Sequence, residues 1–197
     1  MTVIKTTINR RSFLKVSAIA GGGLMLNFSW LADYKPVAED GTAIPKEWFE
    51  LNSYIKIGEN GIVTLMAPNP EFGSNVKTSL PMIVADELDI DWKNVVVEQA
   101  DFYPERFDRQ MTGGSQGVRQ GWKSLRTAGA TARQMLINAA AQTWGVPSSE
   151  ITTEAGILRH KQSGRKAGYG ELVSKAAGLP IPKEVTLKKV SDFKIIG

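Results

Sequence analysis

Residues 112–147, TGGSQGVRQGWKSLRTAGATARQMLINAAAQTWGVP, are the stretch from which the fold is most readily inferred. Apolar and small side chains recur along it at steps of four and three: Val118, Trp122, Leu125, Gly129, Ala132, Leu136, Ala139 and Thr143. This spacing places them on one face of an α-helix, so we predict a long helix from about Gln116 to Trp144. Small residues at 128–132 permit close packing against a sheet or another helix. Gly145-Val146-Pro147 then ends the helix.

Strand signals flank a turn upstream of the long helix. Residues 54–57 and 62–66 are rich in β-branched and aromatic side chains, and Glu59-Asn60-Gly61 separates the two runs. Asn-Gly between such runs is typical of a β-hairpin, because glycine accepts a positive φ. The run Val95-Val96-Val97 predicts a further strand.

Helix and strand signals alternate along the rest of the chain. Apolar residues at steps of three and four predict a helix from about Val76 to Leu88, which begins near Pro81 or is kinked there. Residues 151–153 and 156–159 indicate a second hairpin, and residues 169–177 a short helix. This order predicts an α+β fold, in which a mixed or antiparallel sheet with hairpins is packed by two or three helices, one of them long.

Two polar loops that contain glycine come directly before the two larger helices. Gly73-Ser74-Asn75 leads into the first helix, and Thr112-Gly113-Gly114-Ser115 leads into the second. Backbone N–H groups at a helix start have no partner within the helix, and together with the helix dipole they favour an anionic group. Both loops are therefore candidates for jointly holding a phosphate-bearing ligand. A plain turn with a helix N-cap is the alternative for either loop.

Composition narrows the chemistry that this sequence can carry. It has no cysteine and a single histidine, His160. These counts exclude disulfides, thiolate zinc sites, cysteine-ligated iron–sulfur clusters and multi-histidine metal sites within the sequence. A Ser-His-Asp hydrolase would have to use His160 as its base, and we expect this residue to be exposed. Asp86, Glu87 and Asp89, near the end of the first helix, are expected to form a solvated face.

The N-terminal segment accounts for the formal net charge of +4. Residues 1–32 contain no acidic residue and four basic ones: Lys5, Arg10, Arg11 and Lys15. The basic balance is therefore no argument for a nucleic-acid partner, and none is expected.

The same segment resembles an export signal. Asn9-Arg10-Arg11-Ser12-Phe13-Leu14-Lys15, followed by an apolar run with glycines up to Leu26, is similar to the twin-arginine signal of bacteria. The resemblance implies export to the periplasm in the folded state. The apolar run is too short to span a membrane, and whether the segment is removed or keeps the protein at the membrane stays open.

Two longer segments resemble one protein family. Residues 70–89, PEFGSNVKTSLPMIVADELD, and residues 112–133 are similar to the first and second cofactor loops, with their helices, of the xanthine dehydrogenase/aldehyde oxidase family. The similarity is greatest to the molybdopterin-binding beta subunit of the isoquinoline 1-oxidoreductase type. Those subunits also commonly begin with a twin-arginine signal, and the resemblance extends to Gly197.

The resemblance implies a role for each loop. The first loop of the family reads Glu-Met-Gly-Gln-Gly, and Gly73 matches its first glycine. Ser74 stands in place of the glutamine beside the molybdenum's oxo group, and Asn75 in place of the second glycine. Serine is shorter than glutamine, so it would reach the metal centre only through a water. The second loop, Thr112-Gly113-Gly114-Ser115, is expected to contact the cofactor through backbone amides and the Ser115 hydroxyl.

The resemblance also implies an activity and partners. The complete enzyme would carry molybdopterin cytosine dinucleotide, and would hydroxylate N-heterocycles or aldehydes oxidatively with water as the source of oxygen. The pterin, rather than a side chain, holds the metal in this family, so no metal ligand is expected here. The implied partners are the remaining domains of the molybdopterin subunit and a small [2Fe–2S] subunit, with a cytochrome c acceptor as a further candidate.

Length is the main departure from the family, whose subunits are several times longer. Their catalytic glutamate lies near the far C-terminus, so no catalytic residue is expected in this chain, and no turnover by the chain alone. Glu71, beside the first loop, is expected to be a solvated carboxylate. The chain is expected to be a fragment, an early-ended product or one half of a split subunit.

The expected domains are a signal segment (1–32), a linker or extended arm (33–50) and the N-terminal portion of a molybdopterin-binding domain (51–197). The rival interpretation is a non-enzymatic exported binding module, or a degenerate remnant of the same fold. Ser74 and the short length favour that rival. An exported hydrolase would require His160 in a cleft near a serine.

Overall fold

The computed structural model describes residues 45, 47–107 and 109–196, all within one unit, Ile44–Gly197. The expected signal segment and most of the expected linker lie outside the described residues. In the part of the chain that the structure describes, no helix is both long and apolar enough to cross a membrane.

A four-stranded sheet forms the base of the fold. Its strands, in spatial order, are β1 (Trp48–Asn52), β2 (Ile55–Gly58), β3 (Val63–Ala67) and β4 (Val95–Gln99). The predicted hairpin is β2–β3, and Gly61 in its turn has a φ of 83°. β1 pairs antiparallel with β2 and starts within the stretch expected to be a linker, whereas β4 pairs parallel with β3.

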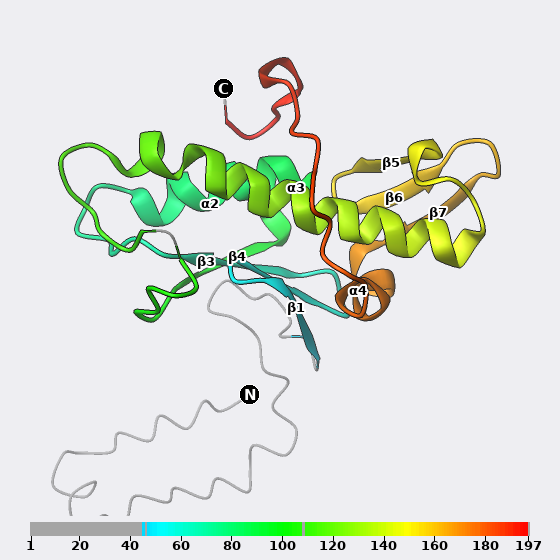
Figure 1. Cartoon of the computed structure of the whole chain (residues 1–197), viewed down its shortest axis with the longest axis horizontal. Coiled ribbons are helices and arrows are strands. Elements are labelled where there is room, and N and C mark those ends of the chain that lie inside the picture. Colours follow the sequence, from blue (N-terminus) through cyan, green and yellow to red (C-terminus); the bar gives the residue numbers. More distant parts are fainter. Residues whose placement is uncertain (1–44, 46, 108, 197) are drawn as a thin grey trace, which may run out of the picture. The chain divides into compact units, whose positions relative to one another are not determined.

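Two helices cover one face of this sheet. α2 (Val76–Leu88) joins the parallel strands β3 and β4, and α3 (Gly117–Trp144) follows β4. Figure 1 shows the two helices side by side over the sheet. α2 begins at Val76, so Pro81 lies inside it rather than at its start. The long predicted helix is confirmed to within one residue of its expected start.

A smaller antiparallel sheet lies near the C-terminal end of α3 (Figure 1). It consists of β5 (Ile151–Glu154), β6 (Ile157–His160) and β7 (Arg165–Gly168). β5 and β6 are the predicted second hairpin, whereas β7 was not predicted. α4 (Tyr169–Ala177) follows β7, and a tail with one short 3₁₀ turn (Val190–Asp192) runs back across α3.

Apolar side chains from both sheets and all three helices form one core. Among its most deeply buried members are Ile55, Ile57, Leu65, Leu80, Leu136 and Leu158. Removing these side chains from water is the main force that holds the helices on the sheet. The fold is therefore α+β with one long helix, as the sequence predicts.

Candidate functional site

The two glycine-bearing loops leave the same edge of the four-stranded sheet. β3 and β4 are parallel neighbours, and Ala67 at the end of one pairs with Gln99 at the end of the other. The chain after β3 forms the loop that opens α2, and the chain after β4 forms the loop that opens α3. Because the carboxyl ends of parallel strands meet at one edge, both loops start there, which is where ligands commonly bind in sheets with such crossovers.

Hydrogen bonds join the loops directly. The Nδ2 of Asn69 donates to the carbonyl of Met111 at 2.6 Å, and the Oγ1 of Thr112 donates to the carbonyl of Pro70 at 2.6 Å. Asn69 is buried although it is polar. Asn69 lies between Pro68 and Pro70, which restrict the backbone of the loop. A polar residue in such a rigid loop often makes a structural hydrogen bond, and this signal in the sequence was missed.

A hollow of about 440 Å³ opens between the loops and the starts of α2 and α3. Six of the residues that line it are Ser74, Ser79, Thr112, Gly113, Gly114 and Ser115. Five of these belong to the predicted site, and the other two predicted residues, Gly73 and Asn75, flank Ser74 in the chain. The structure thus brings the two predicted segments together around one space.

Both loops need residues that accept a left-handed backbone. Gly73 has a φ of 99° and Asn75 a φ of 60°, while Gly114 has 61° and Ser115 has 54°. Asparagine is among the few non-glycine residues that adopt this region readily, which explains physically how Asn75 replaces the family's glycine. Serine does so less readily, so Ser115 is held in a strained conformation within the hollow.

The backbone donors of the first loop are already occupied. The Oε1 of Glu71 accepts hydrogen bonds from the N–H groups of Gly73, Ser74 and Asn75 at 2.5, 2.6 and 3.1 Å. Its Oε2 accepts from the N–H of Lys77 in the first turn of α2 at 3.1 Å. The hydrogen bond from the N–H of Lys77, together with those from the loop, lowers the pKa of Glu71. Desolvation of the carboxylate acts in the opposite direction but is the weaker effect. The side chain is exposed as expected, but it caps the loop and the helix rather than being merely solvated.

The backbone donors of the second loop are open. Among the described residues, the N–H groups of Gly113, Gly114 and Ser115 donate to no other group of the protein. These three residues line the hollow and lie directly before Gln116, the N-cap of α3, a helix of 28 residues. They offer consecutive donors at the positive end of a helix dipole.

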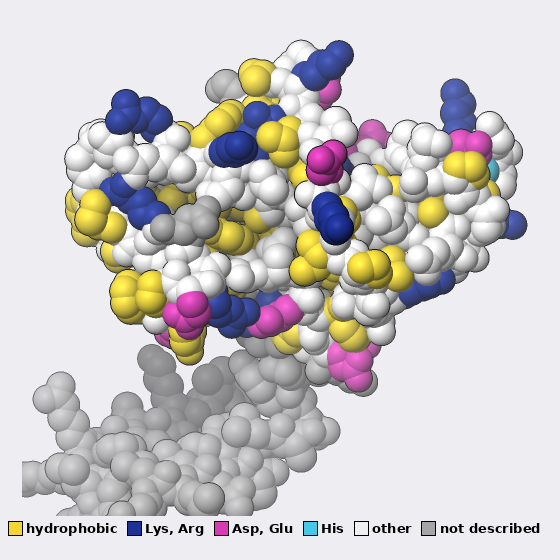
Figure 2. All heavy atoms as spheres, viewed as in Figure 1, with side chains coloured by type: hydrophobic (Ala, Val, Ile, Leu, Met, Phe, Trp, Pro, Cys, Tyr) yellow, Lys and Arg dark blue, Asp and Glu magenta, His cyan; other side chains and the backbone are white. Residues whose placement is uncertain are grey.

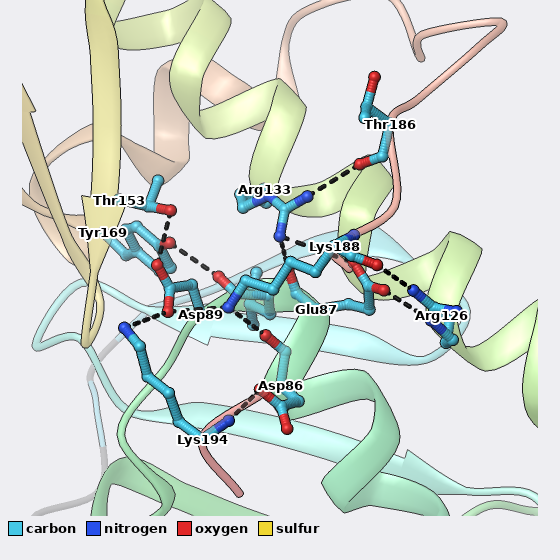
Figure 3. Close-up of polar contacts among 11 residues, drawn as sticks. Asp86, Glu87, Asp89, Arg126, Arg133, Thr153, Tyr169, Thr186, Lys188 and Lys194 are labelled. Carbon is cyan, nitrogen blue, oxygen red and sulfur yellow. Dashed lines mark hydrogen bonds and ion pairs between the residues drawn. The ribbon is translucent and has the colours of Figure 1, made fainter. Parts of the chain in front are cut away.

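The acidic cluster near the end of α2 is buried, and the expectation of a solvated face is wrong (Figure 3). The Oε1 of Glu87 lies 2.7 Å from the Nε of Arg126, and its Oε2 accepts from the N–H of Lys188. The carboxylate of Asp86 accepts the N–H groups of Lys194, Ile195 and Ile196. Cations of α3 and backbone N–H groups of the C-terminal tail therefore satisfy these carboxylates.

Asp89 completes this cluster. It contacts the Nζ atoms of Lys188 and Lys194 at 2.9 and 3.1 Å and accepts from the hydroxyl of Thr153. Burial alone would raise the pKa of Asp89, but these hydrogen bonds and the charge of Lys188 lower it overall. In the described part of the chain, no group of three or more His, Asp or Glu side chains is arranged to hold a metal ion.

The single histidine is also buried, contrary to the expectation that it is exposed. The Nδ1 of His160 lies 2.7 Å from the Oγ of Ser163, and its Nε2 lies 2.9 Å from the Oε2 of Glu150. A serine is thus beside the histidine, as a hydrolase would need. Neither residue lines the hollow between the loops, however, and Ser163 lies in the exposed turn between β6 and β7. The contacts fix that turn.

Comparisons with known proteins identify relatives of the whole described region. A family profile described as a molybdopterin cofactor-binding domain matches residues 36–195. The beta subunit of isoquinoline 1-oxidoreductase from Brevundimonas diminuta is 38% identical over 129 residues, 62% of this chain and 16% of that protein. A subunit of nicotinate dehydrogenase from Pseudomonas putida is 32% identical over 164 residues, 82% of this chain and 14% of that protein.

A solved structure shares the fold. Quinoline 2-oxidoreductase from Pseudomonas putida 86 superposes with a TM-score of 0.51 at 21% identity, over 64% of this chain and 16% of that chain. A membrane-bound aldehyde dehydrogenase of Gluconacetobacter polyoxogenes is 28% identical over 98% of this chain and 25% of that protein. The chain therefore spans a quarter or less of each of these relatives.

Proposed function

Because this chain belongs to the xanthine dehydrogenase family of molybdopterin-binding subunits, we propose that it forms part of the cradle for the cofactor of a molybdenum hydroxylase. The observation that carries the proposal is the single hollow onto which both glycine-bearing loops open. When bound, the cofactor would supply oxidative hydroxylation of N-heterocycles or aldehydes, with oxygen taken from water. The residues of this chain would bind and orient it.

The residues around the hollow suit a negatively charged, polar group. The open N–H groups of Gly113, Gly114 and Ser115 are donors for phosphate oxygens, as at other helix starts that bind phosphate. The Ser115 side chain adds a hydroxyl, and Ser74 of the first loop lines the same hollow. Gly113 leaves room for a close approach, because nothing lies within 4 Å of a Cβ built there.

Exposed apolar side chains at this end of the molecule support further domains as partners. Phe72, Phe102 and Met111, in or beside the two loops, are 70%, 75% and 57% exposed. Figure 2 shows apolar side chains at the surface over this end, where Figure 1 places the start of α3. Surfaces of this kind mark contact sites, and the relatives have most of their length outside the matched segment. The remaining domains of the complete protein would cover the hollow.

Electron transfer would need a redox centre held outside these 197 residues. The chain has no cysteine, so it cannot ligate an iron–sulfur cluster through thiolates. A small [2Fe–2S] subunit is the partner that fits, and a cytochrome c is a candidate acceptor beyond it.

The twin-arginine-like segment supports assembly before export to the periplasm. Replacing Arg10 and Arg11 by lysine should then keep the protein in the cytoplasmic fraction, as immunoblots of fractionated cells would show.

Cofactor binding can be tested without turnover. The full chain, purified from a bacterium that makes the cofactor, should release a pterin and a cytosine nucleotide that mass spectrometry identifies. Gly113→Ala should reduce the amount severalfold, because the added methyl group would occupy space that the cofactor needs for its close approach. The variant should still fold, since nothing lies within 4 Å of the new Cβ and Gly113 has no positive φ. Gly178→Ala, after α4, is the matched control, since its Cβ would make only ordinary contacts. Absence of pterin from the original chain, or equal amounts in both variants, would contradict the proposal.

The rival, a binding module without chemistry, is favoured by Ser74 in place of the family's glutamine. Both interpretations predict no oxidation of an aldehyde or a quinoline by the chain alone. The two interpretations predict different turnover once the remaining domains of a relative are added to the chain. Restored turnover supports the enzyme, whereas bound pterin without turnover supports the module.

A further inference from the structure

The two loops differ in one respect that the resemblance does not predict. Each opens a helix, and each contributes to the same hollow. Yet the first loop has its N–H groups bonded to the carboxylate of Glu71, whereas those of the second loop have no partner in the described part of the chain. An anionic ligand therefore meets two chemically different surfaces.

Glu71 occupies the position that a bound anion would take at the first loop. Its two carboxylate oxygens together accept four backbone N–H groups, three from the loop and one from Lys77 in α2. A carboxylate tethered in the same chain has a high effective concentration at these donors, so a free phosphate competes with it poorly. Its negative charge also opposes a second anion at the same place.

The same contacts fix the backbone at residue 74. The N–H of Ser74 donates to Glu71, while Ser74 also lines the hollow. With the backbone donors bonded to Glu71, the side chain of residue 74 is the polar group that this residue can still offer to a ligand in the hollow.

We propose that Glu71 is a positioning residue that occupies the backbone N–H donors of the first loop. This loop then meets the cofactor through the side chain of residue 74, and the phosphate groups bind at the second loop. The inference rests on the proposed function for the nature of the ligand. The closure of the first loop itself is a property of the chain without ligand, and is tested separately.

The first experiment uses the full chain without ligand. Amide hydrogen exchange, followed by nuclear magnetic resonance, should become faster by about tenfold or more at Gly73, Ser74 and Asn75 in Glu71→Ala, because hydrogen bonds to a charged acceptor are lost. Glu71→Gln should give an intermediate increase, since its amide oxygen still accepts. Glu184→Ala, at an exposed carboxylate in the tail, is the matched control. Unchanged exchange in α3 shows that the variants remain folded.

The second experiment adds inorganic pyrophosphate as the probe. In the original chain it should shift the amide resonances of Gly113, Gly114 and Ser115, and leave those of the first loop in place. In Glu71→Ala it should shift both sets.

The outcomes separate the inference from the proposed function. Unaltered first-loop exchange in Glu71→Ala, or pyrophosphate shifts at both loops of the original chain, would overturn the inference and leave the proposed function standing. Shifts at neither loop would overturn phosphate binding at the second loop and count against the proposed function. The exchange data would still decide whether Glu71 closes the first loop.

Discussion

Glu87 on α2 and Arg126 on α3 form a buried ion pair, with 2.7 Å between Oε1 and Nε. The guanidinium of Arg126 also lies over the rings of Trp122 and Phe193, at 5.3 and 5.1 Å from their centroids. One arginine therefore links α2, α3 and the C-terminal tail. Because the pair is largely removed from water, the loss of Glu87 leaves the guanidinium of Arg126 buried without its carboxylate.

We expect Glu87→Ala to lower the free energy of unfolding by about 3–5 kcal/mol, since Arg126 and Arg133 lose their buried carboxylate. The matched control is Glu50→Ala, which breaks the exposed pair with Arg106 and should cost about 0–1 kcal/mol. Urea denaturation of both variants measures the difference. Similar values for the two would show that the buried pair contributes no more than the surface pair.

Gly129→Ala should destabilise the chain by about 1–3 kcal/mol. Alanine is normally the better helix former by about 0.5–1 kcal/mol, so the expected sign is reversed here. The reason is the close packing of α3 on α2: a Cβ at Gly129 would lie 2.5 Å from the carbonyl oxygen of Val84. Gly117→Ala, whose Cβ would lie 3.5 Å from Val76, should leave thermal stability unchanged or raise it. A stabilised Gly129→Ala would mean that the helices separate easily.

Stability should fall in acid partly through Asp89. The pKa of Asp89 is lower in the folded chain than in the unfolded one, so the folded state binds fewer protons at mildly acidic pH. This contribution is complete above about pH 4, the ordinary pKa of aspartate, and is lost as the pH falls through the lowered pKa. Asp89→Asn should flatten the pH dependence and cost about 1–3 kcal/mol at neutral pH, because Lys188 loses its charged partner. Unfolding curves across that range, with Glu184→Gln as control, check this; an unaltered slope would contradict it.

Ser115→Gly should raise the free energy of unfolding by up to about 1 kcal/mol, because glycine accepts the φ of 54° without strain. Removing the hydroxyl from the hollow should at the same time lower pterin content. Ser74→Gly is the matched control, since Ser74 is not among the residues with a positive φ, and it should not stabilise the chain. Equal effects of the two substitutions on stability would show that Ser115 carries no strain.

Local patterns predicted the elements that are long or strongly periodic. The bounds of α2, α3 and α4 and both hairpins follow from apolar spacing and from turn residues such as Gly61. β1 and β7 were missed because neither contains a β-branched residue and each fully buries only one side chain. Their strand conformation depends on pairing with neighbours, which no local pattern encodes.

The sequence predicted the two loops of the candidate site, but not which of their backbone donors are already bonded. That both loops share a hollow agrees with the sequence interpretation, and the parallel pairing of β3 with β4 is the physical reason. The burial of Asp86 and Glu87 was not foreseen, since their partners come from residues far along the chain. The hydrogen bonds from the loop N–H groups to the carboxylate of Glu71 depend on the backbone conformation at Gly73, which the composition of the loop does not reveal.

The hydrogen bonds between Asp86 and residues 194–196 set the order in which these two parts of the fold come together during synthesis. Asp86 is 108 to 110 residues ahead of the backbone groups that it binds. At ribosomal speeds of about 5–20 residues per second, about 5–20 seconds pass between the two. Throughout that interval the carboxylate of Asp86 lacks these three donors, so the C-terminal end of α2 reaches its final polar environment only after residues 194–196 have been made.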